Sequence, residues 1–229
     1  ENDFHIYPGH GDKTTLKNIS FSIKSGEKVA IIGASGSGKT TISQLIAGFY
    51  AKNSGDILYN DISIDNISKK SLREHLFLVL QMPILFNNTL RFNLTMGENI
   101  SNEKIKEALK IAQLNSMLEN LPDGLDTIVG KMGIRLSGGQ RQRLSIARMI
   151  LANPSVVIFD ESTSALDVQT ETKLFENLEN ILKDKTVITI AHRLSTVKNA
   201  SKIFVLEDGE LVQSGTHMEL EDEIGHYKE

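Results

Sequence analysis

The stretch IIGASGSGKTTISQLIAG, from Ile31 to Gly48, joins an apolar run to a helical pattern, and residues Gly33 to Thr40 within it match the spacing GxxxxGK[ST]. Glycines let the main chain curl so that several N–H groups point at one anion, and the start of the following helix adds positive potential. The lysine supplies a cation for the outer phosphates, and the threonine hydroxyl is a ligand for Mg²⁺. A glycine-rich turn with a chance lysine is the alternative. The apolar run before it and the helical pattern after it favour a nucleoside triphosphate site.

Composition sets the class of protein. The chain has 229 residues, of which 40% are hydrophobic and 24% charged, values typical of a globular domain. It has no cysteine, which excludes disulfides and thiolate metal sites. Its net charge of −4 does not favour nucleic acid binding through bulk charge. The chain begins at Glu1, so we expect it to be part of a longer protein.

Short apolar runs alternate with helical patterns over much of the chain. The runs Val29–Ile32, Val156–Phe159 and Val187–Ala191 are predicted buried strands. Strands separated by helices predict an α/β fold with a mostly parallel sheet covered on both faces. The alternation in LKNISFSI, from Leu16 to Ile23, predicts a half-buried strand.

Turn and capping residues mark further elements. Hairpins are expected at Asn60-Asp61 and Asp208-Gly209. A helix with Ser101 as its N-cap is expected around residues 105–112, because its apolar residues share one face. Other helices are expected from Gly138 to Asn153, around residues 174–181 and, in a short form, near Leu194.

The run VVIFDE ends in two carboxylates, Asp160 and Glu161. In open α/β sheets, ligands bind at the carboxyl ends of strands. Asp160 is therefore a candidate to hold Mg²⁺, directly or through water, and Glu161 to activate an attacking water as general base. The alternative is a strand that leaves the sheet into solvent.

The run LSGGQRQR, from Leu136 to Arg143, places a serine and two glycines at the start of a helix. This is a second candidate anion-binding turn. A helix N-cap with a flexible lead-in is the alternative.

With this run, the chain resembles the nucleotide-binding domains of ATP-binding cassette (ABC) proteins over nearly all its length, because LSGGQ is their signature. Tyr7 resembles the aromatic residue that stacks on adenine, and Gln81 resembles the glutamine that links Mg²⁺ and the attacking water to the membrane-facing lobe. SALD, from Ser164 to Asp167, resembles the loop at the dimer interface, and His192 the histidine at the γ-phosphate.

The resemblance implies that two domains bind head to tail and enclose two ATP molecules with Mg²⁺. It implies ATP-binding roles for Tyr7, Gly33, Ala34, Ser35, Gly36, Ser37, Gly38, Lys39, Thr40, Thr41 and Gln81. It implies catalytic roles for Glu161, His192, Lys39 and Gln81, and Mg²⁺ ligation by Thr40, Gln81 and Asp160. The signature residues Leu136, Ser137, Gly138, Gly139 and Gln140 would act on the partner's ATP, and Ser164, Ala165, Leu166 and Asp167 would lie at the interface.

It also implies a P-loop NTPase core with an antiparallel β subdomain, over residues 1–82 and 155–229, and a helical subdomain over residues 83–154. The segments after Gln81 and before Leu136 resemble those of exporters, although exporters commonly carry Glu where this chain has Lys131. We therefore expect an ATPase that powers export at the cytoplasmic face of the cell membrane, attached to a transmembrane domain and without a nucleic acid partner. The alternatives are an importer ATPase subunit or a non-transport ABC ATPase of DNA repair or of the ribosome.

Overall fold

The structure is a computed structural model that describes residues 4–7 (main chain only), 16, 19–160, 165–191, 197, 199–222, 225 and 227. Its contacts divide the chain into two compact units. We call the first the sheet unit, which comprises Glu1–Leu78, Pro154–Glu161 and Asp184–Glu229, and the second the helical unit, which comprises Val79–Asn153 and Ser162–Lys183. None of the helices among the described residues has both the length and the apolar composition of a membrane span.

The sheet unit is built on a six-stranded sheet with the strand order β12-β11-β3-β10-β9-β6. Its strands in chain order are β3 (Lys28–Gly33), β6 (Leu76–Val79), β9 (Val156–Asp160), β10 (Thr186–Ile190), β11 (Lys202–Glu207) and β12 (Glu210–Gly215). The neighbours β11, β3, β10 and β9 run parallel, and β12 returns antiparallel to β11 after the turn at Asp208-Gly209. The predicted mostly parallel α/β fold is confirmed.

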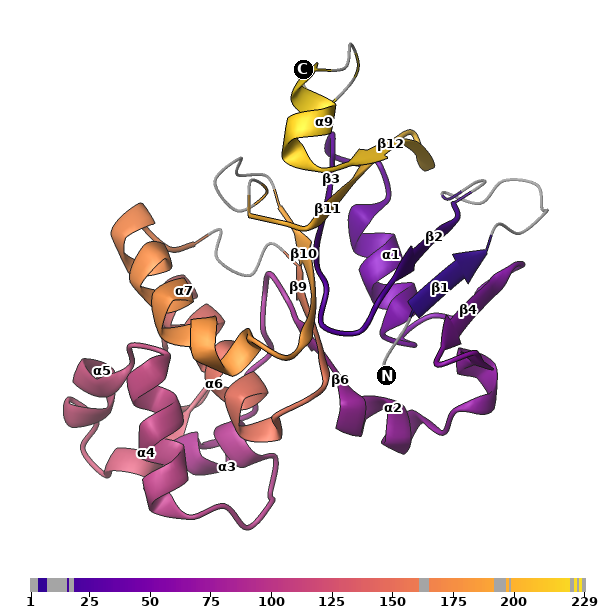
Figure 1. Ribbon diagram of the computed structural model, residues 1–229. Helices are drawn as coiled ribbons and strands as arrows, with labels where there is room; N and C mark the ends of the chain where they lie inside the picture. The colour runs from indigo at the N-terminus through magenta and orange to yellow at the C-terminus, as the bar shows by residue number, and fades with distance from the viewer. Residues whose placement is uncertain are drawn as a thin grey trace. The chain divides into compact units, whose positions relative to one another are not determined.

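The sheet unit also contains a second sheet and several helices (Figure 1). Helix α1 (Lys39–Ile46) contacts β3, β9 and β10 and buries Ile42 and Ile46. The antiparallel sheet has the order β2-β1-β4-β5, built from β1 (Phe4–Tyr7), β2 (Phe21–Ile23), β4 (Asp56–Tyr59) and β5 (Ile62–Ser63). The ring centroids of Phe21 on β2 and Phe204 on β11 stack 4.5 Å apart. The remaining elements are η1 (Ile64–Asn66), α2 (Lys69–His75) and α9 (His217–Asp222).

Two local predictions in this unit have different outcomes. Asn60 and Asp61 have positive φ angles of 50° and 60° between β4 and β5, which confirms the hairpin. The strand predicted from Leu16 is too long, because β2 begins only at Phe21. Leu16, Ile19 and Ser20, which the structure describes, lie outside any strand, so the alternation at these residues does not mark strand pairing. The short helix expected near Leu194 lies mostly outside the described residues.

The helical unit contains α3 (Leu90–Thr95), α4 (Asn102–Ile111), α5 (Asn115–Glu119), η2 (Gly124–Asp126), α6 (Gly138–Ala152) and α7 (Val168–Leu182), with the small strand pair β7 (Asn88–Thr89) and β8 (Ile128–Val129). Ser101 caps α4 by accepting a hydrogen bond from the Lys104 N–H, as the sequence predicts. The helices share an apolar core that includes Ile105, Leu109 and Leu144. Helical periodicity places these residues on facing sides of α4 and α6.

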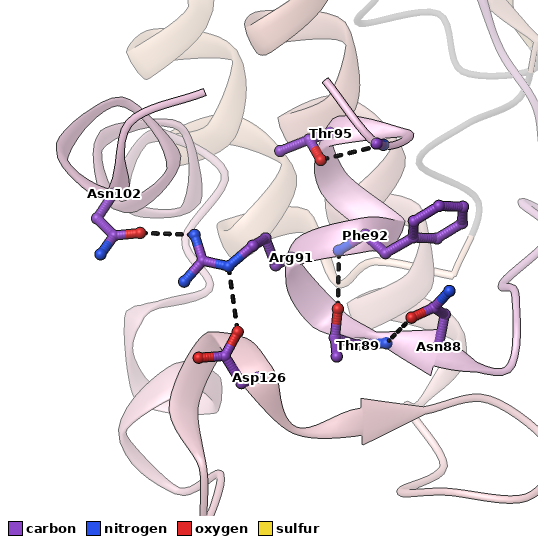
Figure 2. A network of polar contacts seen from close by, with 8 residues as sticks. Asn88, Thr89, Arg91, Phe92, Thr95, Asn102 and Asp126 are labelled. Atoms are coloured by element: carbon purple, nitrogen blue, oxygen red, sulfur yellow. Dashed lines mark hydrogen bonds and ion pairs between the residues drawn. The ribbon is translucent and has the colours of Figure 1, made fainter. Parts of the chain in front are cut away.

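A network of exposed polar contacts joins the starts of α3 and α4 to the end of η2 (Figure 2). Arg91 on α3 donates from Nε to Asp126 Oδ1 at 3.1 Å and from Nη1 to Asn102 Oδ1 at 2.6 Å. The hydroxyl of Thr89 caps α3 by accepting from the Phe92 N–H at 3.0 Å. These contacts fix the first turns of α3 and α4 and the end of η2 relative to one another.

Asn93, on the other side of α3, is fully buried and bonds to the main chain of residues 86–89. Its Oδ1 accepts from the Phe86 N–H at 2.9 Å, and its Nδ2 donates to the Phe86 carbonyl at 2.9 Å and the Thr89 carbonyl at 3.1 Å. Arg148 on α6 donates to Asn93 Oδ1 at 3.1 Å and to the Ile84 carbonyl at 2.9 Å. Burial lowers the pKa of Arg148 to about 10, so its guanidinium stays charged at neutral pH.

We predict that Asn93→Ala lowers the free energy of unfolding by about 3 kcal/mol or more, since it leaves several buried polar groups without partners. The matched change Asn102→Ala removes an exposed contact of Arg91 and should cost no more than about 0.5 kcal/mol. Urea denaturation of both variants measures the difference. Equal costs would show that the Asn93 contacts do not stabilise the unit.

Candidate functional site

The glycine-rich turn lies between β3 and α1, as predicted, and its glycines are needed for space and for backbone angle. A Cβ at Gly33 would lie 2.1 Å from the carbonyl oxygen of Leu206 on the neighbouring strand β11. Gly38 has a φ of +100°, and a Cβ there would lie 2.4 Å from Leu16 Cδ2. A side chain at Gly33 would displace the turn, and one at Gly38 would be strained by the positive φ angle. Ala34, Ser35 and Gly36 form its exposed tip.

Lys39, the first residue of α1, folds back over this turn. Its side chain is only 5% exposed, and its ammonium donates to the carbonyls of Gly33 and Ala34, both at 2.8 Å. Ser37 is 3% exposed, and within the described part of the chain its hydroxyl has no hydrogen-bond partner. A buried cation next to an unsatisfied hydroxyl, at a helix start, fits an oxyanion.

Asp160 lies at the carboxyl end of β9 and reaches the first turn of α1. Its Oδ1 lies 3.3 Å from the hydroxyl of Thr40, and its Oδ2 lies 3.1 Å from the hydroxyl of Ser43. The carboxylate is 3% exposed, so these hydroxyls offset the cost of its burial. The oxygens of Thr40 and Asp160 are the hard donors that Mg²⁺ prefers. Thr41, which follows Thr40 in α1, is half-buried.

The sequence pattern did not predict a role for Ser43. The spacing of three residues between Thr40 and Ser43 was the available signal, since it places both hydroxyls on one face of α1. The close approach of Leu206 to Gly33 had no signal in the sequence, because it depends on the pairing of β11 with β3.

In the helical unit, the signature residues form the start of α6. The Ser137 hydroxyl accepts from the Gln140 N–H at 3.2 Å, and the Gln140 side chain accepts from the Ser137 N–H at 2.8 Å. This reciprocal capping box fixes the first turn of a 15-residue helix. Leu136, just before it, is buried. Ser137 therefore caps a helix, as the alternative interpretation of this run expected, and the two glycines after it lie at the positive end of α6.

Two residues of the SALD segment lie against this helix start. A Cβ at Gly139 would lie 3.1 Å from Leu166 Cδ2 and 3.3 Å from the Ala165 carbonyl oxygen, whereas a Cβ at Gly138 would make only an ordinary contact at 3.5 Å. Gly139 thus allows the close approach. Asp167 caps α7 by accepting from the Thr170 N–H at 2.9 Å, and this hydrogen bond lowers the pKa of its carboxyl group.

Gln81 lies before α3 in the helical unit, and its carbonyl accepts from the side chain of Gln142 at 3.0 Å. The remaining predicted residues, Glu161, Ser164 and His192, lie outside the described residues, as does the side chain of Tyr7. The structure therefore brings Lys39, Thr40 and Asp160 together in the sheet unit. Separately, it brings the signature residues and residues 165–167 together in the helical unit.

The comparisons with known proteins agree with this geometry. The family model described as "ABC transporter" matches residues 16–164. The ATP-dependent lipid A-core flippase of Chromobacterium violaceum is 46% identical over 217 residues, which are 94% of this chain and 37% of the relative. A putative multidrug export ATP-binding/permease protein of Staphylococcus aureus (strain NCTC 8325 / PS 47) is 46% identical over 214 residues, or 93% of this chain and 37% of the relative.

A solved structure, that of a bacterial Atm1-family ABC exporter with ATP bound, matches with a TM-score of 0.88 and 37% identity. The match covers 96% of this chain and 39% of that one. The chain thus spans little more than a third of the length of the relatives that it matches. Because the family model matches more than half of the chain and the relatives are this similar over nearly all of it, the chain belongs to the ABC transporter family.

Proposed function

We propose that this chain binds ATP with Mg²⁺, hydrolyses ATP in a head-to-tail dimer, and drives export through a transmembrane domain. The observation that carries the proposal is the buried ammonium of Lys39 within the glycine turn. The next residue, Thr40, pairs with the distant carboxylate of Asp160. An ammonium hydrogen-bonded to neutral carbonyls gains when phosphate oxygens replace them, because charged hydrogen bonds are stronger. The turn therefore favours a ligand that carries phosphate oxygens.

Thr40 and Asp160 would hold Mg²⁺, together with Gln81 as the resemblance implies, and the ion would neutralise charge on the phosphates. Among the described residues, no three His, Cys, Asp or Glu side chains gather as a metal site. Mg²⁺ commonly binds one or two carboxylates together with substrate phosphates and water.

The other roles rest on the family resemblance. Tyr7 would stack on the adenine, Glu161 would accept a proton from the attacking water, and His192 would contact the γ-phosphate. The same proposal divides the chain into two functional parts. These are a core with the β subdomain, over residues 1–82 and 155–229, and a helical subdomain, over residues 83–154.

The start of α6 supports a second contact with the triphosphate. Its first turn is capped and carries two glycines, so it can approach an anion closely. We assign this contact to the ATP held by a second copy, with Ser137, Gly138 and Gly139 opposite the γ-phosphate. Residues 164–167 would then lie at the interface between the copies.

Exposed apolar side chains in the helical unit support a membrane partner. Met82, Ile84 and Phe86 are exposed after Gln81, and Met132 is 87% exposed before the signature. The Met132 N–H donates to Asn87 Oδ1 at 3.1 Å, which ties the two segments together. We propose that this surface, with Lys131, meets the transmembrane domain of an exporter at the cytoplasmic face of the cell membrane. The named relatives are exporters or flippases, which favours export over the repair, ribosome and importer alternatives.

Lys39→Ala should weaken ATP binding by about 10- to 100-fold, because a charged hydrogen-bond donor to the phosphates is lost. Titration calorimetry measures the affinity, and Lys24→Ala in an exposed turn is the matched control. Unchanged affinity in a folded Lys39→Ala protein would contradict the assignment of the turn.

Glu161→Gln should leave ATP affinity unchanged and slow turnover by about 10²- to 10⁴-fold, the usual contribution of a general base. It should also accumulate an ATP-bound dimer, which gel filtration coupled to light scattering detects. Full activity in this variant would remove Glu161 from its role.

Mixing two inactive variants tests whether the copies share a site. Gly138→Asp places a negative charge at the start of α6, where the structure has room for the Cβ. A mixed dimer of one Gly138→Asp chain and one Lys39→Ala chain holds a single complete site. In that site, the intact glycine turn of the first chain faces the intact signature of the second. The mixture should therefore hydrolyse ATP although neither variant does so alone. A mixture that stays inactive while mixed dimers form would disprove the shared site.

A further inference from the structure

Gln142, on α6, joins two segments that lie far from it in the chain. Its Nε2 donates to the main-chain carbonyl of Gln81 at 3.0 Å, and its Oε1 accepts from the main-chain N–H of Ala165 at 3.1 Å. All three residues belong to the helical unit. One carboxamide thus holds the chain at Gln81 and at the SALD segment.

Both contacts define the orientation of this carboxamide. A carbonyl can only accept and an N–H can only donate, so the flipped amide would face two repulsive contacts. Gln142 is only 3% exposed, and its own polar atoms therefore need these partners. Because the donor and the acceptor share one rigid plane, a shift of either segment disturbs the bond to the other.

A second link from α6 reaches the same region without Gln81. Arg143 Nη1 donates to the Gln113 carbonyl at 2.7 Å, and Gln113 Nε2 donates to the Thr170 carbonyl at 3.2 Å. Burial lowers the pKa of Arg143, and the carboxylate of Asp167 opposes this effect. This link holds the first turn of α7, whereas Gln142 connects Ala165, which precedes α7, with the Gln81 segment.

We infer that Gln142 is a positioning residue for ATP hydrolysis, which holds the Gln81 segment and residues 165–167 in one fixed arrangement. The inference rests on the function proposed above, in which Gln81 reaches the attacking water and residues 164–167 lie at the dimer interface. Gln142 itself contacts neither ATP nor Mg²⁺ in this scheme. Its loss should therefore lower kcat and leave KM unchanged, since the groups that grip the phosphates are elsewhere.

The test compares variants in the full-length transporter proposed above. Gln142→Met keeps the length of the side chain and removes both hydrogen bonds, and kcat should fall about 10- to 100-fold, with KM within about twofold of the unaltered protein. Gln113→Asn is the matched control. It shortens a side-chain amide that bonds to Thr170, and asparagine tolerates the positive φ of 56° at this position. Its kcat should stay within about twofold.

Gln142→Asn provides a second measurement if Gln142→Met does not fold. It keeps a polar carboxamide on a stem one carbon shorter, so it cannot reach Gln81 and Ala165 at once. Its kcat should fall with KM unchanged, and the Ala165 N–H should exchange faster with solvent deuterium. Either folded variant with an unchanged kcat would overturn the inference, and so would an equal loss in Gln113→Asn. If the unaltered transporter hydrolyses no ATP, the proposed function itself fails.

Discussion

The buried carboxylate of Asp160 is the contact on which the glycine turn depends. It accepts hydrogen bonds at the end of β9 from Thr40 and Ser43, which lie on one face of α1 near its start. The helix start is thereby fixed to the sheet, while Gly33 is fixed against Leu206 of β11 on the other side of β3. With both ends held, the turn presents its N–H groups without a large loss of conformational entropy on binding.

Much of this fold could be predicted because it depends on local rules. The positive φ angles at Asn60 and Asp61, the cap at Ser101 and the left-handed end of α6 at Asn153 follow from the preferences of those residues in turns and caps. The apolar run before Asp160 predicts a buried strand, and every residue of β9 is indeed buried. The same local rules predicted the strand, turn and helix around Lys39.

The features that the sequence does not predict depend on contacts between distant residues. Neither α3, of six residues, nor α5, of five, is long enough to show helical periodicity. The hydrogen bond between Asn93 and Arg148 joins residues 55 positions apart. The sequence around either residue does not indicate that the other is its partner. The strand predicted from Leu16 was too long for a related reason. Alternation shows that side chains point to opposite faces, but pairing depends on a neighbouring strand.

In the proposed function, the contacts of Lys39 would affect how the free energy of ATP binding is divided between enthalpy and entropy. A free lysine side chain carries about 2 kcal/mol of rotamer entropy, which a mobile residue would lose when it grips a phosphate. Here the ammonium is already held by Gly33 and Ala34, so that entropy is lost on folding. When ATP binds, the ammonium exchanges neutral acceptors for charged ones. The binding free energy should therefore come mainly from a favourable enthalpy rather than from a favourable entropy.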